Sequence, residues 1–334
     1  MSSKARKALP FILYNIVVVA LFLGVIEFTL HSLLHHSSQV PKFLLTAYRK
    51  YYAWSVRSTI QMEPACAQYD SSLFYTLKPG HCTFSNLEFT HDLLINSLGV
   101  RDTEAALNSP EIIFLGDSFT MGWGVPEDSC YVRHYGKTKN KRVLNAGISS
   151  YGTIRELRLL SRIKRDSLKI LVIQYHDSDI LENREFITND NTLKISSRDA
   201  YEKYSRNVRA QSGYFFGKHT AFIGKYWVKD IMGHFREKAK PDEAKSFTNA
   251  LLHSPVPLTG INIVVFETFS YNHERTFLDD LKKEIDNNSY PDYIKNIKIV
   301  KLEGILSTGD YYILDDHLNS SGHKKIADKL LQIL

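Results

Sequence analysis

The first hydrophobic pattern along the chain is an apolar run close to the N-terminus. From Leu9 to Ile26 it is interrupted only by Asn15 and a few small residues, and it is apolar on every face until Glu27. At about 1.5 Å per residue, a helix of this length crosses a hydrocarbon core of about 30 Å. A buried core helix, the alternative, is usually amphipathic. The pattern therefore predicts a membrane-spanning helix.

Charges on either side of the run bear on its orientation. Three basic residues lie between positions 4 and 7, so the positive-inside rule places the N-terminus in the cytoplasm and everything after His31 outside. Basic residues between positions 42 and 50 weaken this bias. A cleaved signal peptide is the competing interpretation, but the run is long for one, and residues 31–38 lack a small-x-small cleavage site. We therefore expect an uncleaved, single-pass anchor.

Beyond residue 110, short apolar runs alternate with helical patterns. The apolar runs predict strands at 112–115, 142–145, 170–174, 261–266 and 297–302. Helical periodicity is found at 154–164, 275–286 and 321–334. Strands that alternate with helices indicate an α/β fold with a parallel sheet covered on both faces. Residues 180–260 are too many for a simple crossover between strands, and they predict a mainly helical insertion.

These patterns divide the chain into three parts. Residues 1–36 are expected to form a cytoplasmic N-terminus and membrane anchor, residues 37–110 a connector and N-terminal extension, and residues 111–334 the α/β domain. Within the connector, residues 40–59 mix basic and aromatic side chains, which favours a helix close to the membrane surface.

Composition narrows the class of protein only slightly. The 334 residues hold 42 Lys plus Arg against 36 Asp plus Glu, a net charge of +6, and 43 % of them are apolar. This globular composition excludes a disordered, collagenous or disulfide-dense chain. The positive surplus is far from the clustered basic stripe of a nucleic-acid binder, so no nucleic-acid partner is expected.

The three cysteines suggest one disulfide. Cys66 and Cys82 flank a polar stretch that contains Pro and Gly, and a location outside the cytoplasm favours a bridge between them, with two free thiols as the alternative. Cys130 would remain unpaired. The sequence has no CxxC motif and no Cys/His cluster with metal-ligand spacing, so no structural zinc site is expected.

Candidate chemistry lies where the predicted strands end, because open α/β sheets form their sites at the carboxyl ends of strands. The first strand ends in a glycine-preceded turn that carries Ser118, which is alternatively a helix N-cap. The second ends in the small-residue loop 145–153, whose backbone N–H groups suit an oxyanion. The third ends in the polar, acidic loop 174–183, and near the C-terminus two aspartates directly precede His317.

Three of these side chains fit nucleophilic catalysis. A serine hydroxyl becomes a nucleophile when a base takes its proton, and the base needs a carboxylate that fixes its tautomer. Ser118, His317 and either Asp315 or Asp316 supply these groups. His317 is alternatively a surface histidine that caps the last helix, whereas His323 fits a packing position within that helix.

With the GDS tripeptide at 116–118 and a D-x-H element at 315–317, residues 111–334 resemble the SGNH, or GDSL-type, serine hydrolases. The resemblance implies a three-layer, flavodoxin-like domain (the SGNH hydrolase fold) that hydrolyses, or sometimes transfers, acyl esters. The Cys66–Cys82 segment and the NSLGVRD, MGWGV and ILEN motifs are similar to those of membrane-anchored SGNH proteins of bacterial envelopes. This likeness implies a single-pass protein of the bacterial inner membrane whose catalytic domain faces the periplasm or the cell exterior.

The resemblance also implies catalytic roles. Ser118 would be the nucleophile, and its own N–H would help to form the oxyanion hole. His317 would be the base and Asp315, two residues earlier, the carboxylate that orients it, with Asp316 as the rival.

Two positions depart from the family pattern in the oxyanion hole. Ser150 stands where the family has a glycine whose N–H is a donor, and Ser178 stands where it has an asparagine. The backbone donor survives at Ser150, but the short Ser178 side chain leaves the third donor weakened, bridged by water or absent. Alternatively, His176 or Asp177 faces the site.

Three hypotheses about function remain open. The first is an esterase that removes acyl, above all acetyl, groups from an envelope glycan or lipid through an acyl-enzyme, without a metal or organic cofactor. The second is an O-acyltransferase component that receives an acyl group from a membrane acyltransferase and passes it to a polysaccharide. The third is a catalytically impaired binding or scaffold protein, suggested by the two altered oxyanion positions.

The insertion is the expected source of substrate choice. Aromatic residues alternate there with cations, a combination that suits sugars or anionic envelope polymers, unless the aromatics simply pack a cap. The residues concerned are Tyr201, Tyr204, Tyr214, Phe215, Phe216, Tyr226 and Trp227, with Lys203, Arg206, Arg209, Lys218 and Lys225.

Overall fold

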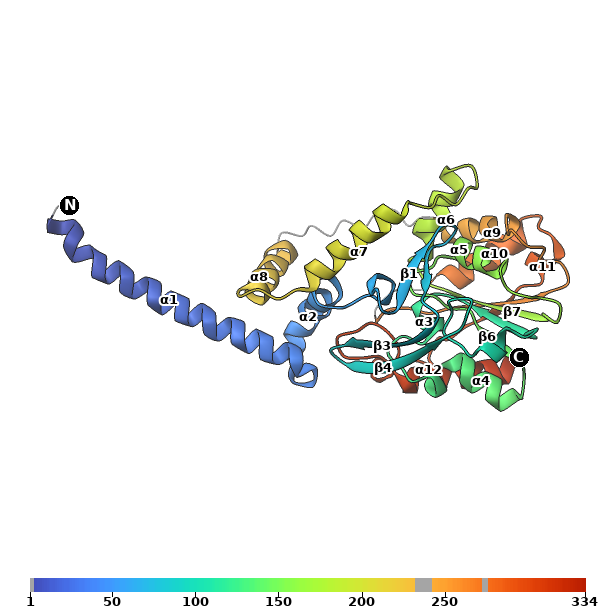
Figure 1. Ribbon diagram of the computed structural model, residues 1–334, viewed down its shortest axis with the longest axis horizontal. Coiled ribbons are helices and arrows are strands. Elements are labelled where there is room, and N and C mark those ends of the chain that lie inside the picture. Colours follow the sequence, from blue (N-terminus) through green and yellow to red (C-terminus); the bar gives the residue numbers. More distant parts are fainter. Residues whose placement is uncertain (1–2, 232–241, 272–275) are drawn as a thin grey trace. The chain divides into compact units, whose positions relative to one another are not determined.

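The computed structural model describes residues 3–231, 242–271 and 276–334, which form two compact units (Figure 1). The helical unit draws on Met1–Arg57, Ala210–Lys238 and Ile313–Asp315. The sheet unit draws on Ser58–Arg209, Ala239–Tyr312 and Asp316–Leu334.

The sheet unit is built on a sheet of five parallel strands. They are β5 (Ile112–Leu115), β6 (Val143–Asn145), β7 (Ile170–Tyr175), β8 (Asn262–Glu267) and β9 (Lys298–Val300). Their order across the sheet is β6-β5-β7-β8-β9, which is the flavodoxin-like 2-1-3-4-5 order. The predicted parallel sheet and its five strands are confirmed.

Helices cover both faces of this sheet. One face carries α5 (Thr153–Leu160), α6 (Asp179–Thr188), α9 (Glu243–Leu252) and α10 (Phe277–Asn287), and the other carries α4 (Tyr131–Lys139) and α12 (Ser320–Ile333). The short α3 (Ser118–Met121) follows β5, α7 (Arg198–Ser212) begins in the sheet unit, and α11 (Asp292–Lys295) precedes β9. Single turns of 3-10 helix lie at Ile60–Met62, Glu104–Leu107, Glu127–Ser129 and Thr308–Asp310.

The helices expected beside the strands are confirmed with shifted ends. The pattern at 154–164 corresponds to α5, which ends earlier, at Leu160, and the pattern at 321–334 corresponds to α12. The pattern at 275–286 corresponds to α10, and residue 275 lies outside the described residues. The insertion expected at about 180–260 contains α6 to α9 joined by irregular segments, and residues 232–241 lie outside the described part.

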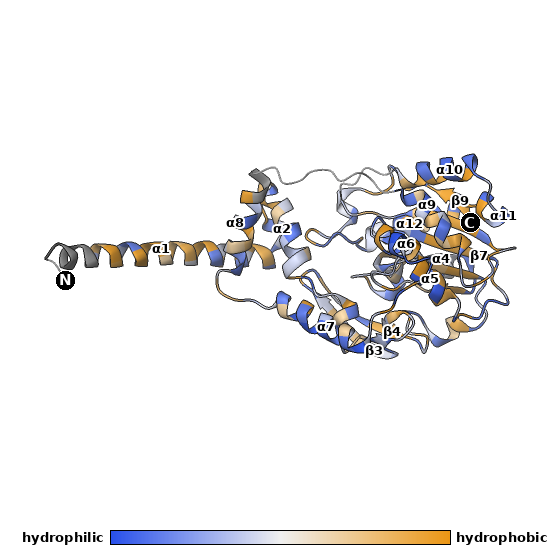
Figure 2. Cartoon of the chain, turned by 90° about the horizontal axis from the view of Figure 1, so that it is seen from above, coloured by the Kyte–Doolittle hydropathy of each residue, from blue (hydrophilic) through white to orange (hydrophobic). Residues whose placement is uncertain are grey.

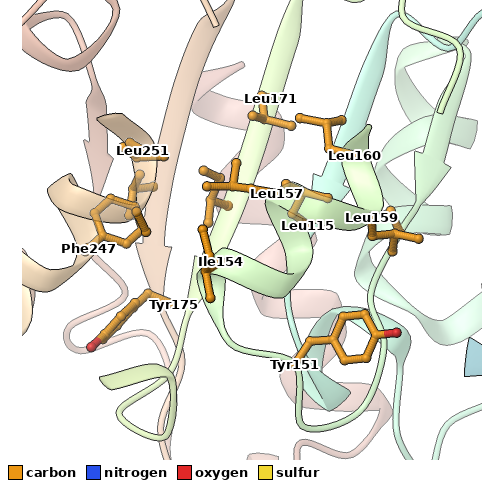
Figure 3. Packing of buried hydrophobic residues seen from close by; sticks show 14 of the residues in the cluster. Leu115, Tyr151, Ile154, Leu157, Leu159, Leu160, Leu171, Tyr175, Phe247 and Leu251 are labelled. Atoms are coloured by element: carbon orange, nitrogen blue, oxygen red, sulfur yellow. The ribbon is translucent and has the colours of Figure 1, made fainter. Parts of the chain in front are cut away.

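Side chains from the strands alternate between two buried cores. Leu115 lies in the core that also contains Leu157 of α5 and Phe247 of α9 (Figure 3). Its neighbour Phe114 lies in the opposite core with Leu330 of α12. Because both faces are covered, every residue of β5 is buried, which explains its continuous apolar run.

Residues before the sheet form two antiparallel hairpins that the hydrophobic pattern did not predict. They consist of β1 (Ala67–Asp70) with β2 (Phe74–Leu77), and β3 (Gly80–Asn86) with β4 (Phe89–Ile95). A disulfide joins Cys66 to Cys82, with the two Cα atoms 5.3 Å apart, so the expected bridge is confirmed. Cys130 is a free, buried thiol, as expected.

The helical unit contains α1 (Ser3–His35), α2 (Lys42–Ser55) and α8 (Lys218–Ile231), with a 3-10 turn at Ser37–Gln39. Within α1, Pro10–His35 is long and apolar enough to cross a membrane, and Figure 2 shows apolar residues along most of it. Its side chains are mostly exposed, with Phe11 71 % accessible, so α1 is not a core helix. The helix expected in the connector is confirmed as α2.

Two buried carboxyl groups of the sheet unit have no ordinary ionic partner. Both side-chain oxygens of Glu156 in α5, and Oδ1 of Asp179 in α6, are buried without a hydrogen-bond partner among the described residues. Burial raises the pKa of both groups well above the usual values, and the charge of Asp117 acts in the same direction on each. Glu156 therefore keeps its proton to a higher pH in the folded protein than in the unfolded chain.

A Glu156→Gln substitution should make the protein more stable at neutral and alkaline pH. The folded-state pKa of Glu156 is raised, whereas the unfolded chain ionises it above about pH 4.3, so its burial costs stability as the pH rises. We expect the thermal unfolding midpoint of the variant to match that of the parent protein at pH 4 and to be higher than that of the parent protein at pH 8. Glu202→Gln, on the exposed side of α7, is the control; an equal effect of Glu156→Gln at both pH values would contradict the assignment.

Candidate active site

The candidate site lies at the switch point of the sheet, where open α/β folds place their ligands. The strand order reverses between β5 and β7, and the loops after these two strands carry Ser118 and His176. Gly116 makes the turn after β5 possible. A Cβ at this position would collide with the side chains of Thr120 and Gln174, so no larger residue fits there.

Ser118 is the first residue of α3 and is 7 % exposed. Asp117 is the N-cap of this short helix, and its Oδ1 accepts a hydrogen bond of 2.9 Å from the N–H of Phe119. The N-cap interpretation that the sequence left open therefore belongs to Asp117, which leaves the Ser118 hydroxyl free for another partner.

That partner is His317. The Ser118 Oγ lies 2.7 Å from His317 Nε2, although the two residues are 199 positions apart in sequence. The imidazole is 7 % exposed and stacks on the Trp123 ring, with centroids 4.8 Å apart and planes inclined by 20°. The Phe119 ring lies 4.8 Å from its centroid as well, so two aromatic side chains fix the plane of the histidine. His317 is thus not a surface histidine.

The loop before His317 is held by a buried carboxylate. Asp310 accepts hydrogen bonds from the Ser307 N–H and hydroxyl, from Ser321 Oγ, and from Lys325 Nζ at 2.7 Å. Burial by itself would raise the pKa of Asp310, but these donors outweigh it and lower that pKa to about 2. His323 lies in α12 and is buried. Burial lowers its pKa to about 3, so the ring is neutral at neutral pH, which agrees with the expected packing role.

Trp123 is itself positioned by the N-terminal extension. Its ring packs edge-on against Phe84, with centroids 5.0 Å apart, in the hairpin β3–β4. The buried Arg101 donates to the carbonyl oxygens of Gly122 at 2.6 Å and Val125 at 2.8 Å. These contacts fix the turn after α3, and with it the ring that stacks on His317.

The two candidate carboxylates differ in their surroundings. Asp316 Oδ1 lies 3.4 Å from His317 Nδ1, while its Oδ2 accepts a hydrogen bond from Ser270 and its side chain is 32 % exposed. Asp315 is fully buried, and its Oδ2 accepts a hydrogen bond of 3.0 Å from the Tyr52 hydroxyl. Its Oδ1 lies 3.5 Å from Arg57 Nη1.

Sequence reasoning missed Tyr52 and Arg57 as partners of Asp315. Tyr52 lies 263 positions before Asp315, and nothing in the basic, aromatic connector distinguishes it from its tyrosine neighbours. The consecutive Asp315, Asp316 and His317 bring one ligand atom each within 4.8 Å of one another. Because His317 Nε2 bonds Ser118 while Nδ1 lies 3.4 Å from Asp316 Oδ1, this group fits a general base oriented by a carboxylate.

The loop after β6 places Ser150 at a left-handed backbone position, with φ of +60°. Its hydroxyl accepts a hydrogen bond of 2.9 Å from Gln61 Nε2. Earlier in the loop, Gly147 lies so close to the backbone of α3 that a Cβ there would collide with Met121 N. The side chain at position 150, which the family pattern does not have, is thus tied to residues before the sheet.

In the loop after β7, the hydroxyl and the N–H of Ser178 both contact the His176 ring. The Ser178 Oγ lies 2.8 Å from His176 Nδ1, and the Ser178 N–H donates to the same nitrogen at 3.2 Å. The His176 ring stacks on Phe119, the residue after Ser118, with centroids 5.4 Å apart. Its Nε2 is buried and has no hydrogen-bond partner among the described residues. His176 is therefore a polar group beside Ser118 with an unused nitrogen.

Comparison with known proteins gives structural similarity only. The chain matches no protein-family model and no curated protein sequence. A protein from Desulfitobacterium hafniense, described as lipolytic and of the G-D-S-L family, is similar with a TM-score of 0.38 and 12 % identity, over 67 % of this chain and 98 % of that one. Phospholipase A1 from Streptomyces albidoflavus is similar with a TM-score of 0.37 and 10 % identity, over 68 % and 100 % of the two chains.

A carbohydrate esterase whose active site is described as having divergent catalytic and non-catalytic binding functions is also similar. Its TM-score is 0.34 at 12 % identity, over 73 % of this chain and 67 % of that one. Because the TM-scores are below 0.4, the functional proposal below rests on the geometry of the site.

Proposed function

We propose that this protein is a membrane-anchored serine ester hydrolase of the SGNH type. The observation that carries the proposal is the 2.7 Å hydrogen bond between the Ser118 hydroxyl and His317 Nε2, at the switch point of the sheet. An imidazole that bonds a serine hydroxyl on one side and has carboxylates next to it in the chain is the arrangement that activates serine for attack on a carbonyl group.

The reaction has two steps. The Ser118 oxygen forms a bond to the ester carbonyl carbon while His317 Nε2 takes the hydroxyl proton, and the carbonyl π electrons move to the carbonyl oxygen. When that oxyanion collapses, the bond to the alcohol oxygen breaks, and the alcohol leaves with the proton from His317. Water then attacks the acyl-enzyme by the same sequence and releases the acid and free Ser118. No cofactor takes part in this scheme.

Asp315 is the carboxylate that we assign to His317. It is fully buried and held by Tyr52 and Arg57, whereas Asp316 is partly exposed and bonds Ser270. A carboxylate fixed in a dry environment orients an imidazole and stabilises the imidazolium better than one in contact with water. Tyr52 and Arg57 are positioning residues in this scheme.

The oxyanion would be held by the N–H groups of Ser118 and Ser150, with His176 in place of the Ser178 side chain as third donor. Because a backbone N–H only donates, the bond from Ser178 N makes His176 Nδ1 an acceptor in the neutral imidazole, which leaves the proton on Nε2. If the imidazole is protonated and Nδ1 bonds Asp177 at 3.0 Å, Nε2 carries a proton as well. In both states the unpartnered Nε2 is a donor.

The finer parts of the proposal concern location and substrate. We place the protein in the bacterial inner membrane through α1, with the sheet unit in the periplasm, where it removes acyl, above all acetyl, groups from an envelope glycan or lipid. The Cys66–Cys82 disulfide supports an oxidising compartment. The exposed Tyr204 of α7, beside Lys203 and Arg206, supports a carbohydrate or anionic substrate.

Reaction of the folded full chain with a serine-directed fluorophosphonate should give one adduct, at Ser118. The probe reports an activated hydroxyl, so Ser118→Ala should abolish labelling, while Ser129→Ala, outside the site, should leave it unchanged. The readout is the mass of the labelled peptide. Absence of labelling in the parent protein would overturn the enzymatic proposal and favour a binding or scaffold protein. If Ser118 is labelled, comparing the amount of released acetate with the amount of acylated oligosaccharide separates hydrolysis from transfer.

Asp315→Asn should lower kcat far more than Asp316→Asn. Loss of the carboxylate that orients the base costs on the order of 10⁴-fold in a serine hydrolase, whereas a partly exposed neighbour costs less than about tenfold. The pair is matched because both substitutions remove one charge beside His317. Turnover of a p-nitrophenyl acetate-type ester at several pH values measures both, and the reverse order of effects would assign the role to Asp316.

His176→Ala should lower kcat by about a hundredfold with little change in KM, as expected for loss of one oxyanion donor. His176→Gln should recover part of that loss, because its amide is also a donor. His253→Ala, at an exposed histidine that bonds its own helix, is the control. An unchanged kcat in His176→Ala would exclude the imidazole from the oxyanion hole.

A further inference from the structure

The segment that leads into α8 lies against the membrane-spanning part of α1. The position where a Cβ of Gly24 would stand is 4.0 Å from Cζ of Phe216, so this ring covers the glycine. Gly24 lies seven residues before His31 in a continuous helix, which is about 10 Å along the helix axis. Phe216 is thus placed beside the apolar run of α1 and not beyond its polar end.

Glu27 fixes the first turn of α8 at the same level. Its carboxylate is buried and accepts hydrogen bonds from the N–H groups of His219, at 3.2 Å, and Thr220, at 2.8 Å. The Thr220 hydroxyl donates at 2.7 Å and the Tyr214 hydroxyl at 3.3 Å. A carboxylate within an apolar helix is stable only if it is partnered, and the partners of Glu27 in the described part of the chain come from this one segment.

The positive charge of Lys218, in the first turn of α8, is also hydrogen-bonded within the protein. Lys218 is 8 % exposed, and its Nζ donates to the carbonyl oxygens of Ser55 at 2.6 Å, Gln211 at 2.8 Å and Gly213 at 2.9 Å. With these three bonds, its ammonium group does not depend on water. The segment therefore carries no uncompensated charge between Tyr214 and Thr220.

What the segment does expose is aromatic. Tyr214 is 55 % accessible, Phe215 62 % and Phe216 71 %, on three consecutive residues. Tyr is enriched at the boundary between the hydrocarbon core and the headgroups, and Phe is among the residues that insert most favourably into the core. A surface made of three large rings, continuous with the lipid-facing surface of α1, fits lipid better than water.

We propose that Tyr214–Gly217 and the first turn of α8 enter the bilayer beside α1, in the leaflet nearer the C-terminal end of that helix. The protein is then attached by a spanning helix together with an aromatic loop, and Glu27 ties the loop to the helix. The partner of this surface is the lipid of that leaflet. The inference rests on the anchoring part of the proposed function and is independent of the reaction.

A nitroxide label at Phe216→Cys in the full chain, in vesicles of phosphatidylcholine and phosphatidylglycerol, tests the proposal. Cys66 and Cys82 form a disulfide and Cys130 is buried, so the new thiol is the accessible one among the cysteines. Power-saturation EPR compares collisions with oxygen, which concentrates in lipid, against a water-soluble nickel chelate. Val18→Cys in the apolar run is the lipid reference, and Lys203→Cys on the exposed side of α7 is the water reference.

We expect the oxygen-to-nickel ratio at Phe216→Cys to be severalfold higher than at Lys203→Cys and to approach that at Val18→Cys. A water-like ratio at Phe216 with a lipid-like ratio at Val18 would overturn the loop inference while the anchor stands. A water-like ratio at Val18 would overturn both. Spin–spin broadening at Phe216 that disappears on dilution with unlabelled chain would assign the surface to a second copy and overturn the lipid proposal.

Discussion

The proposed reaction of this protein depends on one hydrogen bond, between the Ser118 hydroxyl and His317 Nε2. It joins residues 199 positions apart, so both have to be held by rigid surroundings rather than by their neighbours in sequence. On the serine side, the buried strand β5 ends at Gly116, and Asp117 caps the next turn. On the histidine side, two aromatic rings fix the plane of the imidazole. The sheet and the loops after its strands therefore hold two residues that are distant in sequence within hydrogen-bonding distance.

The burial of Ser118 and His317 strengthens the electrostatic interactions at this hydrogen bond. Ser118 and His317 are each 7 % exposed, and the groups that surround them are aromatic or hydrogen-bonded. In such an environment electrostatic interactions are stronger than in water, and an unpartnered polar atom is costly. The free Nε2 of His176 is consistent with a site shaped for an anion that forms only during the reaction.

Much of the fold was predictable because its strands are buried on both faces. A strand such as Ile112–Leu115 leaves an unbroken apolar run, and the glycine after it marks the turn that presents Ser118. The hairpins between Ala67 and Ile95 left no comparable signal, because short strands with one exposed face resemble irregular polar chain. They were found only in the structure.

The partners of the candidate site were harder to predict than its members. Ser118 and His317 lie in recognisable motifs, whereas the contact of Tyr52 with Asp315 depends on how distant segments fold together. The role of His176 depends on a side-chain orientation, since the Ser178 N–H donates to Nδ1 and Nε2 is the nitrogen left without a hydrogen-bond partner among the described residues. Spacing in a sequence carries no information about either.

The contacts of Arg101 show that the candidate site depends on residues before the five-stranded sheet. Its guanidinium holds the carbonyl groups of the turn that carries Trp123, and Phe84 packs against the ring of that tryptophan. A fragment that started at β5 would keep Ser118 and His317 but lose Arg101 and Phe84, which hold Trp123 against the His317 ring. Gene fusions or domain exchanges made at residue 111 would therefore cut through the candidate site, and a boundary near residue 58 would still remove Tyr52 and Arg57, which hold Asp315.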